Sequence, residues 1–208
     1  MLKENCKILY GTTNPAKLRS MKQKLSNFEI EIIGLKDLNL EFEAIDESGN
    51  IPLENARLKA LAYYKVTKMP VFSCDSGLYI EGISEEKQPG VHVRRVNGKE
   101  LNDEEMIVYY TGLAEELGGT AKAKYKNAIV LVMDENNIIE YDGEEISSKY
   151  FLLSSKAHTK RNFGFPLDSI SIEIESNKYY MDMNYEEGSD DFDVDKGFKK
   201  FFSEIIAK

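Results

Sequence analysis

The sequence is poor in the residues and motifs that mark the commonest catalytic and binding sites. Only two histidines, His92 and His158, occur in 208 residues, and such a histidine is more often a surface or hydrogen-bonded residue than a catalyst. The chain has no Walker-type lysine loop, no paired-glycine dinucleotide turn and no zinc-type cluster of histidine and cysteine. Carboxylate, lysine and glycine chemistry therefore remains as the source of any activity.

Long apolar runs and an excess of positive charge are missing as well. No stretch approaches the roughly 20 apolar residues that span a bilayer, and the start of the chain offers no apolar signal core. The net charge is −9, whereas nucleic-acid binding usually needs a basic face. We expect a cytoplasmic protein that binds neither membrane nor nucleic acid, although locally clustered positive charge could still hold a small polyanion.

Length and composition favour one continuous globular fold. The chain contains 42% hydrophobic and 30% charged residues, as folded proteins do. No repeat, low-complexity stretch or Pro/Ser-rich linker divides it, so we expect a single domain over residues 1–208. Cys6 and Cys74 show no metal or redox spacing and are expected to be reduced, buried thiols.

Strand and helix patterns alternate along the chain and predict an α/β fold with a mixed sheet. Asn14 followed by Pro15 is typical of a helix start, and Asn102 followed by Glu105 resembles a capping box. Hydrophobic periodicity gives the remaining elements. The expected helices are 15–26, 53–68, 102–117 and 196–207, and the expected strands are 7–10, 29–34, 71–74, 121–133, 138–141 and 169–175.

The first strand runs into a turn that suits phosphate. Ile8–Tyr10 is followed by Gly11-Thr12-Thr13-Asn14 and then by a helix that carries Lys17 on its first turn. Free backbone N–H groups at a helix start, the positive end of the helix dipole and a lysine ammonium all favour an anion. This segment is therefore the first candidate site.

Two acidic segments and a pair of arginines are further candidates. Asp75-Ser76-Gly77-Leu78 follows an apolar strand, at a place where α/β sheets bind ligands, and an acid there could hold Mg²⁺; an ordinary turn is the alternative. Asp46-Glu47-Ser48-Gly49 by itself reads as a solvated acidic turn. Arg94 and Arg95, after Pro89-Gly90, could clamp a phosphate or lie on a surface edge strand.

Taken in this order, the segments resemble the inosine triphosphate pyrophosphatase family, also called Ham1-like, which removes non-canonical purine nucleotides. Residues 12–17 match the family's S/T-x-N-x-x-K, and residues 47–60 match its E-T-G…E-N-A-x-x-K-A. Residues 75–78 match D-S-G-L, and residues 89–95 match P-G-V/I-Y-S-A-R. Each motif is short, but four of them in register across residues 8–98 make the resemblance specific.

The resemblance implies an elongated mixed β-sheet with flanking helices, which form two lobes around a nucleotide cleft, and usually a homodimer. It also implies hydrolysis of nucleoside triphosphates such as ITP, dITP and XTP to the monophosphate and pyrophosphate. This reaction cleanses the nucleotide pool and depends on Mg²⁺, which Mn²⁺ could replace.

The resemblance also assigns roles by position. Thr12, Asn14 and Lys17 are expected to bind the triphosphate, while Glu47 and Asp75 hold the metal. Lys17 and Asp75 are the expected catalytic residues, because Lys17 offsets phosphate charge and Asp75 acts as metal ligand or base. The remaining expected substrate contacts are Ser76, Arg95, Phe163, Asp168 and Lys196.

The C-terminal half departs from the family where the base is read. Residues 162–169 resemble G-F-G-Y-D-P only in part, although Phe163 can still stack on any base. The family's terminal S-H-R-G corresponds at best to Val194-Asp195-Lys196-Gly197, which lacks the imidazole and the guanidinium. An acidic run over 182–195 stands where the family usually has a base-reading lysine, either as a solvated loop or as acceptors for an exocyclic amine.

Two alternatives to purine cleansing therefore stay open. Fewer donors and more acids disfavour a carbonyl oxygen at position six of the base, so the same chemistry could act on a different base. The rewritten base-reading motifs also fit a nucleotide-binding or interaction protein with weak turnover, although a pure binder has little need of Glu47 and Asp75. Many relatives carry an acid at the position of Cys74, which leaves the number of bound metals open.

Overall fold

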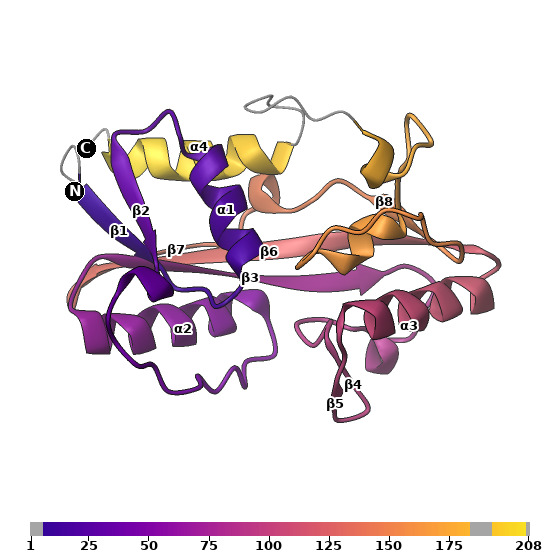
Figure 1. The fold of residues 1–208 in the computed structure, drawn as a ribbon, viewed down its shortest axis with the longest axis horizontal. Helices are drawn as coiled ribbons and strands as arrows, with labels where there is room; N and C mark the ends of the chain where they lie inside the picture. Colours follow the sequence, from indigo (N-terminus) through magenta and orange to yellow (C-terminus); the bar gives the residue numbers. More distant parts are fainter. Residues whose placement is uncertain (1–5, 184–192, 207–208) are drawn as a thin grey trace. The chain divides into compact units, whose positions relative to one another are not determined.

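The computed structural model describes residues 6–183 and 193–206. These residues form a mixed α/β fold with a mixed sheet (Figure 1), which confirms the fold class predicted from the sequence. Within these ranges, no helix combines the length and the apolar character needed to cross a bilayer.

The element bounds follow the sequence pattern closely for the helices and for the first two strands. The helices are α1 (Pro15–Lys24), α2 (Pro52–Thr67), α3 (Asp103–Glu116) and α4 (Asp193–Ile206). The strands are β1 (Cys6–Tyr10), β2 (Ile30–Gly34), β3 (Val71–Ile80), β4 (Arg95–Val96), β5 (Lys99–Glu100), β6 (Thr120–Asp134), β7 (Asn137–Tyr141), β8 (Phe151–Ser154) and β9 (Ser171–Glu173). The short 3₁₀ helices are η1 (Leu35–Asp37), η2 (Glu85–Lys87), η3 (Glu144–Ile146), η4 (Pro166–Ser169) and η5 (Tyr180–Asp182).

The contacts within the chain divide it into two compact units. The first unit consists of Met1–Ser76, Lys126–Ser148 and Glu187–Lys208, and the second of Gly77–Tyr125 and Lys149–Glu186. The long strands β3 and β6 each contribute residues to both units. The single two-lobed domain expected from the sequence stays a prediction.

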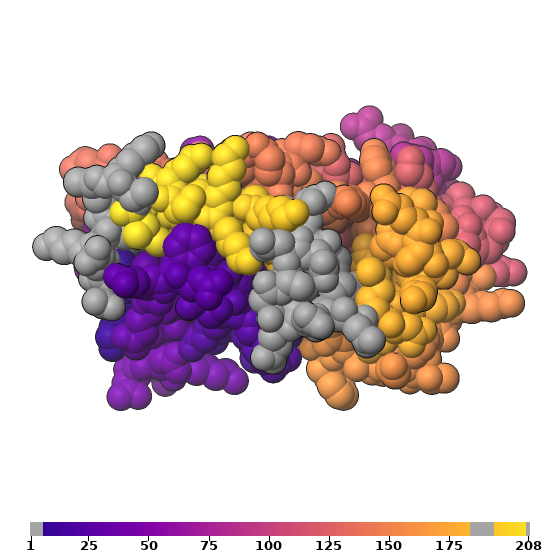
Figure 2. All heavy atoms as spheres, turned by 90° about the horizontal axis from the view of Figure 1, so that it is seen from above, coloured from indigo at the N-terminus to yellow at the C-terminus, as the bar shows by residue number. Residues whose placement is uncertain are grey.

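In the first unit, helices cover both faces of the sheet. Successive side chains of a strand point to opposite faces, so Tyr10 of β1 packs with Met21 of α1 and Phe202 of α4, whereas Leu9 packs with Ala60 of α2. Figure 1 shows α1 and α4 on one face and α2 on the other. Figure 2 looks onto the first of these faces, where α4 (yellow) lies beside α1 (indigo).

The helix ends confirm the capping signals in the sequence. Asn14 caps α1, and its side chain accepts hydrogen bonds from two backbone N–H groups of the first turn. At α3, the Asn102 side chain accepts from the Glu105 N–H at 3.0 Å, and the Glu105 carboxylate accepts from the Asn102 N–H at 2.9 Å. Gly118 and Gly119 then end α3 with φ values of +95° and +99°, which glycine adopts without strain.

The structure corrects the sequence prediction at β3. The strand was expected to stop at Cys74 with a turn over Asp75, but it continues to Ile80. The continuation has a partner, because the N–H of Leu78 donates to the Gly90 carbonyl at 2.9 Å and the N–H of Gly90 donates back at 3.0 Å. Asp75 therefore lies inside a strand rather than in a turn.

The second unit contains further differences from the sequence prediction. β8 was not predicted, and it pairs with β6 and β9. β9 is shorter than the expected strand over 169–175, because η4 takes its first residue and a turn closes with a bond from the Glu173 N–H to the Lys178 carbonyl. Ile174 is consequently 42% exposed and does not share the buried face of Ile170.

β2 lies at one edge of the sheet and is shielded there by charged groups. The N–H of Gly34 donates to the Asp37 carboxylate at 2.8 Å. Asp37 also lies 3.8 Å from the Lys22 ammonium, and Lys7 pairs with Glu31 at 3.3 Å. The Gly34 N–H is therefore bonded within the chain, and the Lys7–Glu31 pair joins β1 to β2, because these two residues lie opposite each other in the sheet.

Two glycines within helices provide a matched test of the packing of α4. A Cβ atom on Gly197 would lie 2.0 Å from the Glu145 carbonyl oxygen, whereas one on Gly112 of α3 would meet nothing within 4 Å. We expect Gly197→Ala to destabilise the protein by about 2 kcal/mol and Gly112→Ala to stabilise it by about 0.5–1 kcal/mol. Urea unfolding of both variants measures this, and similar midpoints would contradict the close contact of α4 with η3.

Candidate active site

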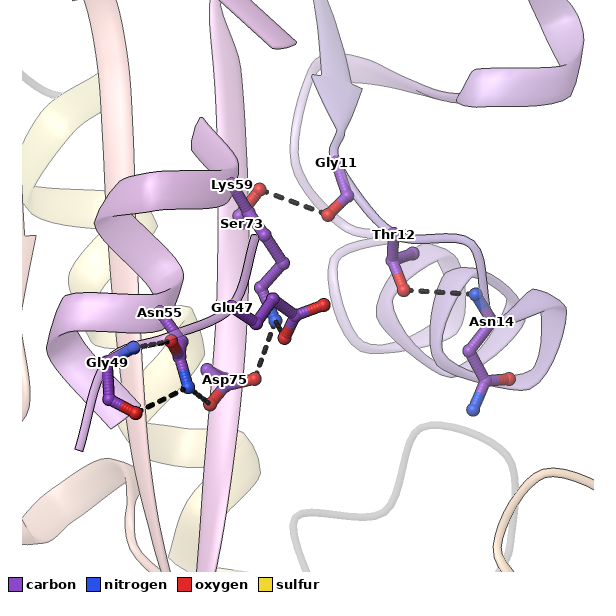
Figure 3. A network of polar contacts seen from close by, with 9 residues as sticks. All are labelled: Gly11, Thr12, Asn14, Glu47, Gly49, Asn55, Lys59, Ser73 and Asp75. Carbon is purple, nitrogen blue, oxygen red and sulfur yellow. Dashed lines mark hydrogen bonds and ion pairs between the residues drawn. The ribbon is translucent and has the colours of Figure 1, made fainter. Parts of the chain in front are cut away.

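The turn after β1 is held tightly against β3. The N–H of Gly11 donates to the Phe72 carbonyl at 2.8 Å, and the Ser73 hydroxyl donates to the Gly11 carbonyl at 3.0 Å (Figure 3). A Cβ on Gly11 would lie 2.4 Å from the Ser73 hydroxyl oxygen and 2.5 Å from the Tyr63 ring. Glycine is therefore needed for the turn to lie this close to β3 and α2.

The N–H groups at the start of α1 are already bonded within the chain. Asn14 accepts from the N–H of Ala16 at 2.8 Å and from that of Lys17 at 3.4 Å, and the Asn14 N–H donates to the Thr12 hydroxyl at 3.2 Å. The expectation of free N–H groups is therefore wrong for these three residues. An anion at this turn would be held by side chains and by the helix dipole instead.

Lys17 supplies positive charge at the same turn. Burial lowers the pKa of its ammonium, the positive charge of Lys59 lowers it further, and Asp75, Cys74 and Glu47 oppose this shift. Among the residues that the structure describes, Lys17 forms no ion pair within 4.0 Å. A bound anion would therefore stabilise a partly buried ammonium that has no close counter-ion in the described part of the chain.

The centre of the site is Lys59, which lies between the two carboxylates expected to hold a metal. Its ammonium donates to Asp75 at 2.5 Å and to Glu47 at 3.0 Å (Figure 3). Burial alone would lower the pKa of Lys59, but Asp75 and Glu47 outweigh burial and raise it. Lys59 is 9% exposed and Asp75 7% exposed, whereas the Glu47 side chain is 38% exposed, so the cluster is desolvated at Lys59 and Asp75 and open to solvent at Glu47.

Asn55 fixes the loop that carries Glu47. Its side chain, 2% exposed, accepts from the Gly49 N–H at 2.8 Å, and its amide nitrogen lies 3.4 Å from the Gly49 carbonyl and 3.5 Å from Asp75 (Figure 3). A Cβ on Gly49 would lie 2.6 Å from the Cβ of Glu54. The amide and the glycine together hold the loop against the first turn of α2.

Lys59 and Asn55 were not identified as site residues from the sequence. Both belong to the segment that resembles E-N-A-x-x-K-A, which was the available signal. Their spacing of four places both side chains on one face of α2, and both are buried. A buried amide and a buried ammonium on the same face of a helix indicate a polar site rather than a solvated surface.

The donor set fits a hard divalent cation. Glu47 and Asp75 already converge on one positive charge, and Mg²⁺ usually takes one or two carboxylates together with waters and phosphate oxygens. In the ranges covered by the structure, no three His, Cys, Asp or Glu side chains form a metal-binding group. Burial raises the pKa of Cys74 to about 12, so this thiol is neutral and adds no negative charge beside Asp75.

The first unit thus brings together Thr12, Asn14, Lys17, Glu47 and Asp75, as Figure 3 and the electrostatic coupling of Lys17 show. Two further predicted residues of this unit are placed as follows. Ser76 is half-buried on β3, and Lys196 is exposed on α4. The neighbour of Lys196, Asp195, forms an ion pair with Lys24 at 2.6 Å, so that carboxylate stabilises the packing of α4 on α1.

Arg95, Phe163 and Asp168 belong to the second unit. Arg95 is exposed on β4. Its neighbour Arg94 pairs with Asp103 at 2.8 Å and donates to the Leu101 carbonyl at 3.0 Å. Arg94 therefore has a structural role, and Arg95 is the arginine that solvent and ligands can reach.

An exposed aromatic ring lies close in sequence to a partly buried carboxyl group in the second unit. Phe163 is 83% exposed, and the N–H of the next residue, Gly164, donates to Asp103 at 3.2 Å. The Asn162 amide donates to Asp168 at 2.8 Å. Burial raises the pKa of Asp168 to about 6, although the hydrogen bond from Asn162 opposes this shift.

Comparison with known proteins gives a consistent result. The model of the Ham1 family matches residues 8–190. A dITP/XTP pyrophosphatase of Leptospira interrogans is 36% identical over 135 residues, which are 64% of this chain and 65% of that protein. The matched segment thus spans just under two thirds of that relative. A dITP/XTP pyrophosphatase of Thermus thermophilus is 28% identical over 87% of this chain and 83% of its own length.

Solved structures support the same fold. A HAM1 protein from Coxiella burnetii superposes with a TM-score of 0.72 at 22% identity, and covers 96% of this chain and 99% of its own. The Ham1 protein of Staphylococcus aureus gives a TM-score of 0.70 at 20% identity, with the same coverage. At these identities the likeness concerns the fold alone.

The raised pKa of Asp168 leads to a prediction about stability. Its folded pKa of about 6 exceeds the ordinary value of 3.8, so the stability that this group contributes is full below the unfolded pKa and is lost as the pH rises through about 6. Asp168→Asn removes that loss and should be more stable than the natural protein at pH 8 by about 2 kcal/mol, with a smaller difference at pH 5. Urea unfolding between pH 5 and 8 measures the difference, and parallel pH profiles would contradict the prediction.

Proposed function

The chain belongs to the Ham1 family, and we propose that it is a nucleoside triphosphate pyrophosphatase that acts on non-canonical purine nucleotides such as ITP, dITP and XTP. Its products would be the nucleoside monophosphate and pyrophosphate. The observation that carries the proposal is the convergence of Lys17, Lys59, Glu47 and Asp75 in one unit. Relatives named dITP/XTP pyrophosphatase support the substrate class.

We propose Mg²⁺ as the cofactor, held by Glu47 and Asp75 with Mn²⁺ as a substitute. When bound, such an ion supplies Lewis-acid stabilisation of phosphate oxygens. Two carboxylates that share one cation, the buried Asp75 and the partly exposed Glu47, are suitable ligands. Asn55 and Gly49 would keep Glu47 in place, because they fix the loop that bears it.

The side chains of the first unit have distinct roles in the proposed reaction. The Lys17 ammonium would bind oxygens of the triphosphate and offset the charge that develops on the leaving pyrophosphate. Water would attack the α-phosphorus while the bond from this phosphorus to the bridging oxygen breaks, and Asp75 would orient this water or accept its proton. Thr12 and Asn14 would position the substrate through the turn that they shape.

A different base preference is the second candidate within the same chemistry. Phe163 offers an exposed ring for stacking, which accepts any base. The Asp168 carboxyl group, bonded to Asn162, would accept a hydrogen bond from an exocyclic amine when ionised. An acceptor at this position favours a base with an amine, which hypoxanthine lacks.

We also propose a homodimer, which the resemblance implies, and a cytoplasmic location, which the sequence pattern led us to expect. Sedimentation velocity at micromolar concentration tests the first proposal. A mass of one chain, about 24 kDa, at all concentrations would contradict the dimer.

A substrate screen with matched variants tests the function. Purified protein is assayed against a panel of nucleoside triphosphates with Mg²⁺ or Mn²⁺, and released pyrophosphate is measured. Lys17→Ala and Asp75→Asn should each reduce kcat/KM about 100-fold or more, because they remove charge at the triphosphate and at the metal. Lys22→Ala, on the same helix and with only a surface ion pair, should retain activity.

The screen also separates the alternatives. Turnover of none of the triphosphates would contradict the proposed function, and calorimetric binding without turnover would identify a nucleotide-binding protein instead. Preferred cleavage of an amine-bearing nucleotide would support the altered base preference.

Phe163→Ala tests the stacking platform. Loss of base stacking should raise KM roughly 5- to 100-fold, equivalent to about 1–3 kcal/mol. Unfolding stability should change by less than about 0.5 kcal/mol because the ring is exposed. An unchanged KM for every substrate that the screen identifies would remove Phe163 from the site.

A further inference from the structure

The position that the proposed metal needs is the position that the Lys59 ammonium now holds. We infer that Lys59 is the resident counter-ion of the Glu47–Asp75 pair. A divalent cation then binds well only when Lys59 releases these carboxylates, and the triphosphate offers Lys59 its replacement partner. This inference rests on the proposed function and adds an order of events to it.

The first argument is the competition for carboxylate oxygens. Lys59 contacts one oxygen of each acid, at 2.5 Å on Asp75 and 3.0 Å on Glu47. The other oxygen of Asp75 faces the Asn55 amide at 3.5 Å. Asp75 is only 7% exposed, so water offers it little else, and a cation must share or replace the contact with Lys59.

The second argument is the charge balance of the cluster. Glu47 and Asp75 contribute two negative charges, and Lys59 and Lys17 contribute two positive charges, so the sum is zero. A divalent ion alone would leave two positive charges in excess beside the buried Lys59 and Asp75, where repulsion is screened less than in bulk water. A triphosphate carries several negative charges and would reverse this imbalance.

The third argument is the reach of the displaced group. Lys59 carries its charge on a flexible stem of four carbons. Its ammonium is close enough to Lys17 for its positive charge to lower the pKa of Lys17. Lys17 stands on the first turn of α1, where the triphosphate is proposed to bind. The ammonium of Lys59 can therefore exchange carboxylate oxygens for phosphate oxygens by turning its side chain, without movement of α2.

Metal binding to the natural protein gives the first test. Bound Mn²⁺ is counted by electron paramagnetic resonance, first with Mn²⁺ alone and then with the α,β-methylene analogue of inosine triphosphate, against blanks with the analogue and no protein. We expect no saturable binding below about 1 mM without the analogue, and at least tenfold tighter binding with it. Equal affinity in the two arms would overturn the inference.

A pair of variants on α2 gives the second test. Lys59→Met keeps the apolar stem but removes the ammonium, and should bind Mn²⁺ alone at least tenfold more tightly than the natural protein. Arg57→Met removes the same charge from the same helix, but Arg57 pairs with Glu140 and contacts neither acid, so its affinity should stay within twofold. Unchanged affinity in a folded Lys59→Met variant, verified by circular dichroism, would overturn the inference.

These outcomes are separate from the outcome for the proposed function. Mn²⁺ binding is measured without turnover, so tight binding to the natural protein in the absence of the analogue overturns the exchange even in an active enzyme. If Mn²⁺ binds as expected in both tests but no triphosphate is hydrolysed, the proposed pyrophosphatase function is overturned, while the exchange of Lys59 for the metal is supported. If Lys59→Met does not fold, Mn²⁺ binding to the natural protein with and without the analogue still tests the inference.

Discussion

The buried ammonium of Lys59 is the constraint on which the arrangement of the site depends. An ammonium taken out of water is costly unless charged or polar partners surround it, and here the partners come from the two segments that precede and follow α2 in the chain. One is a loop with no regular secondary structure over 40–49, which carries Glu47, and the other is the middle of β3. The hydrogen bonds between Asn55 and Gly49 add a second attachment, so that the helix defines the position of the loop.

Unequal strand lengths determine where this cluster lies. β1 ends at Tyr10, opposite Phe72, while its parallel neighbour β3 continues. The turn after β1 therefore lies against residues of β3 that have lost their partner on that side, and Asp75 is three residues further along. A carboxylate inside a strand is thereby brought to the carboxyl end of the adjacent strand, where ligands of α/β sheets bind.

Local signals predicted much of this structure, and long-range pairing explains the rest. Asn14 with Pro15 and Asn102 with Glu105 mark helix starts through contacts within four residues, so the sequence alone reveals them. The extension of β3 past Asp75 has distant partners in Gly90 and in β6, and β8 depends on its partners β6 and β9. The order of the motifs predicted Glu47, Asp75 and Lys17 as residues of one site. The bridging role of Lys59 could not be seen, because a lysine on a helix is ordinarily solvated and only its burial shows otherwise.

The charged border of β2 has a consequence for the behaviour of the protein at high concentration. An open edge strand offers N–H and C=O groups to strands of other molecules and is a template for aggregation. The Asp37 carboxylate accepts a hydrogen bond from the Gly34 N–H and lies 3.8 Å from the Lys22 ammonium. A second chain that added to this edge would have to displace or desolvate these charges. Strand addition at the β2 end of the sheet is therefore disfavoured at Gly34, whose N–H already has a charged partner.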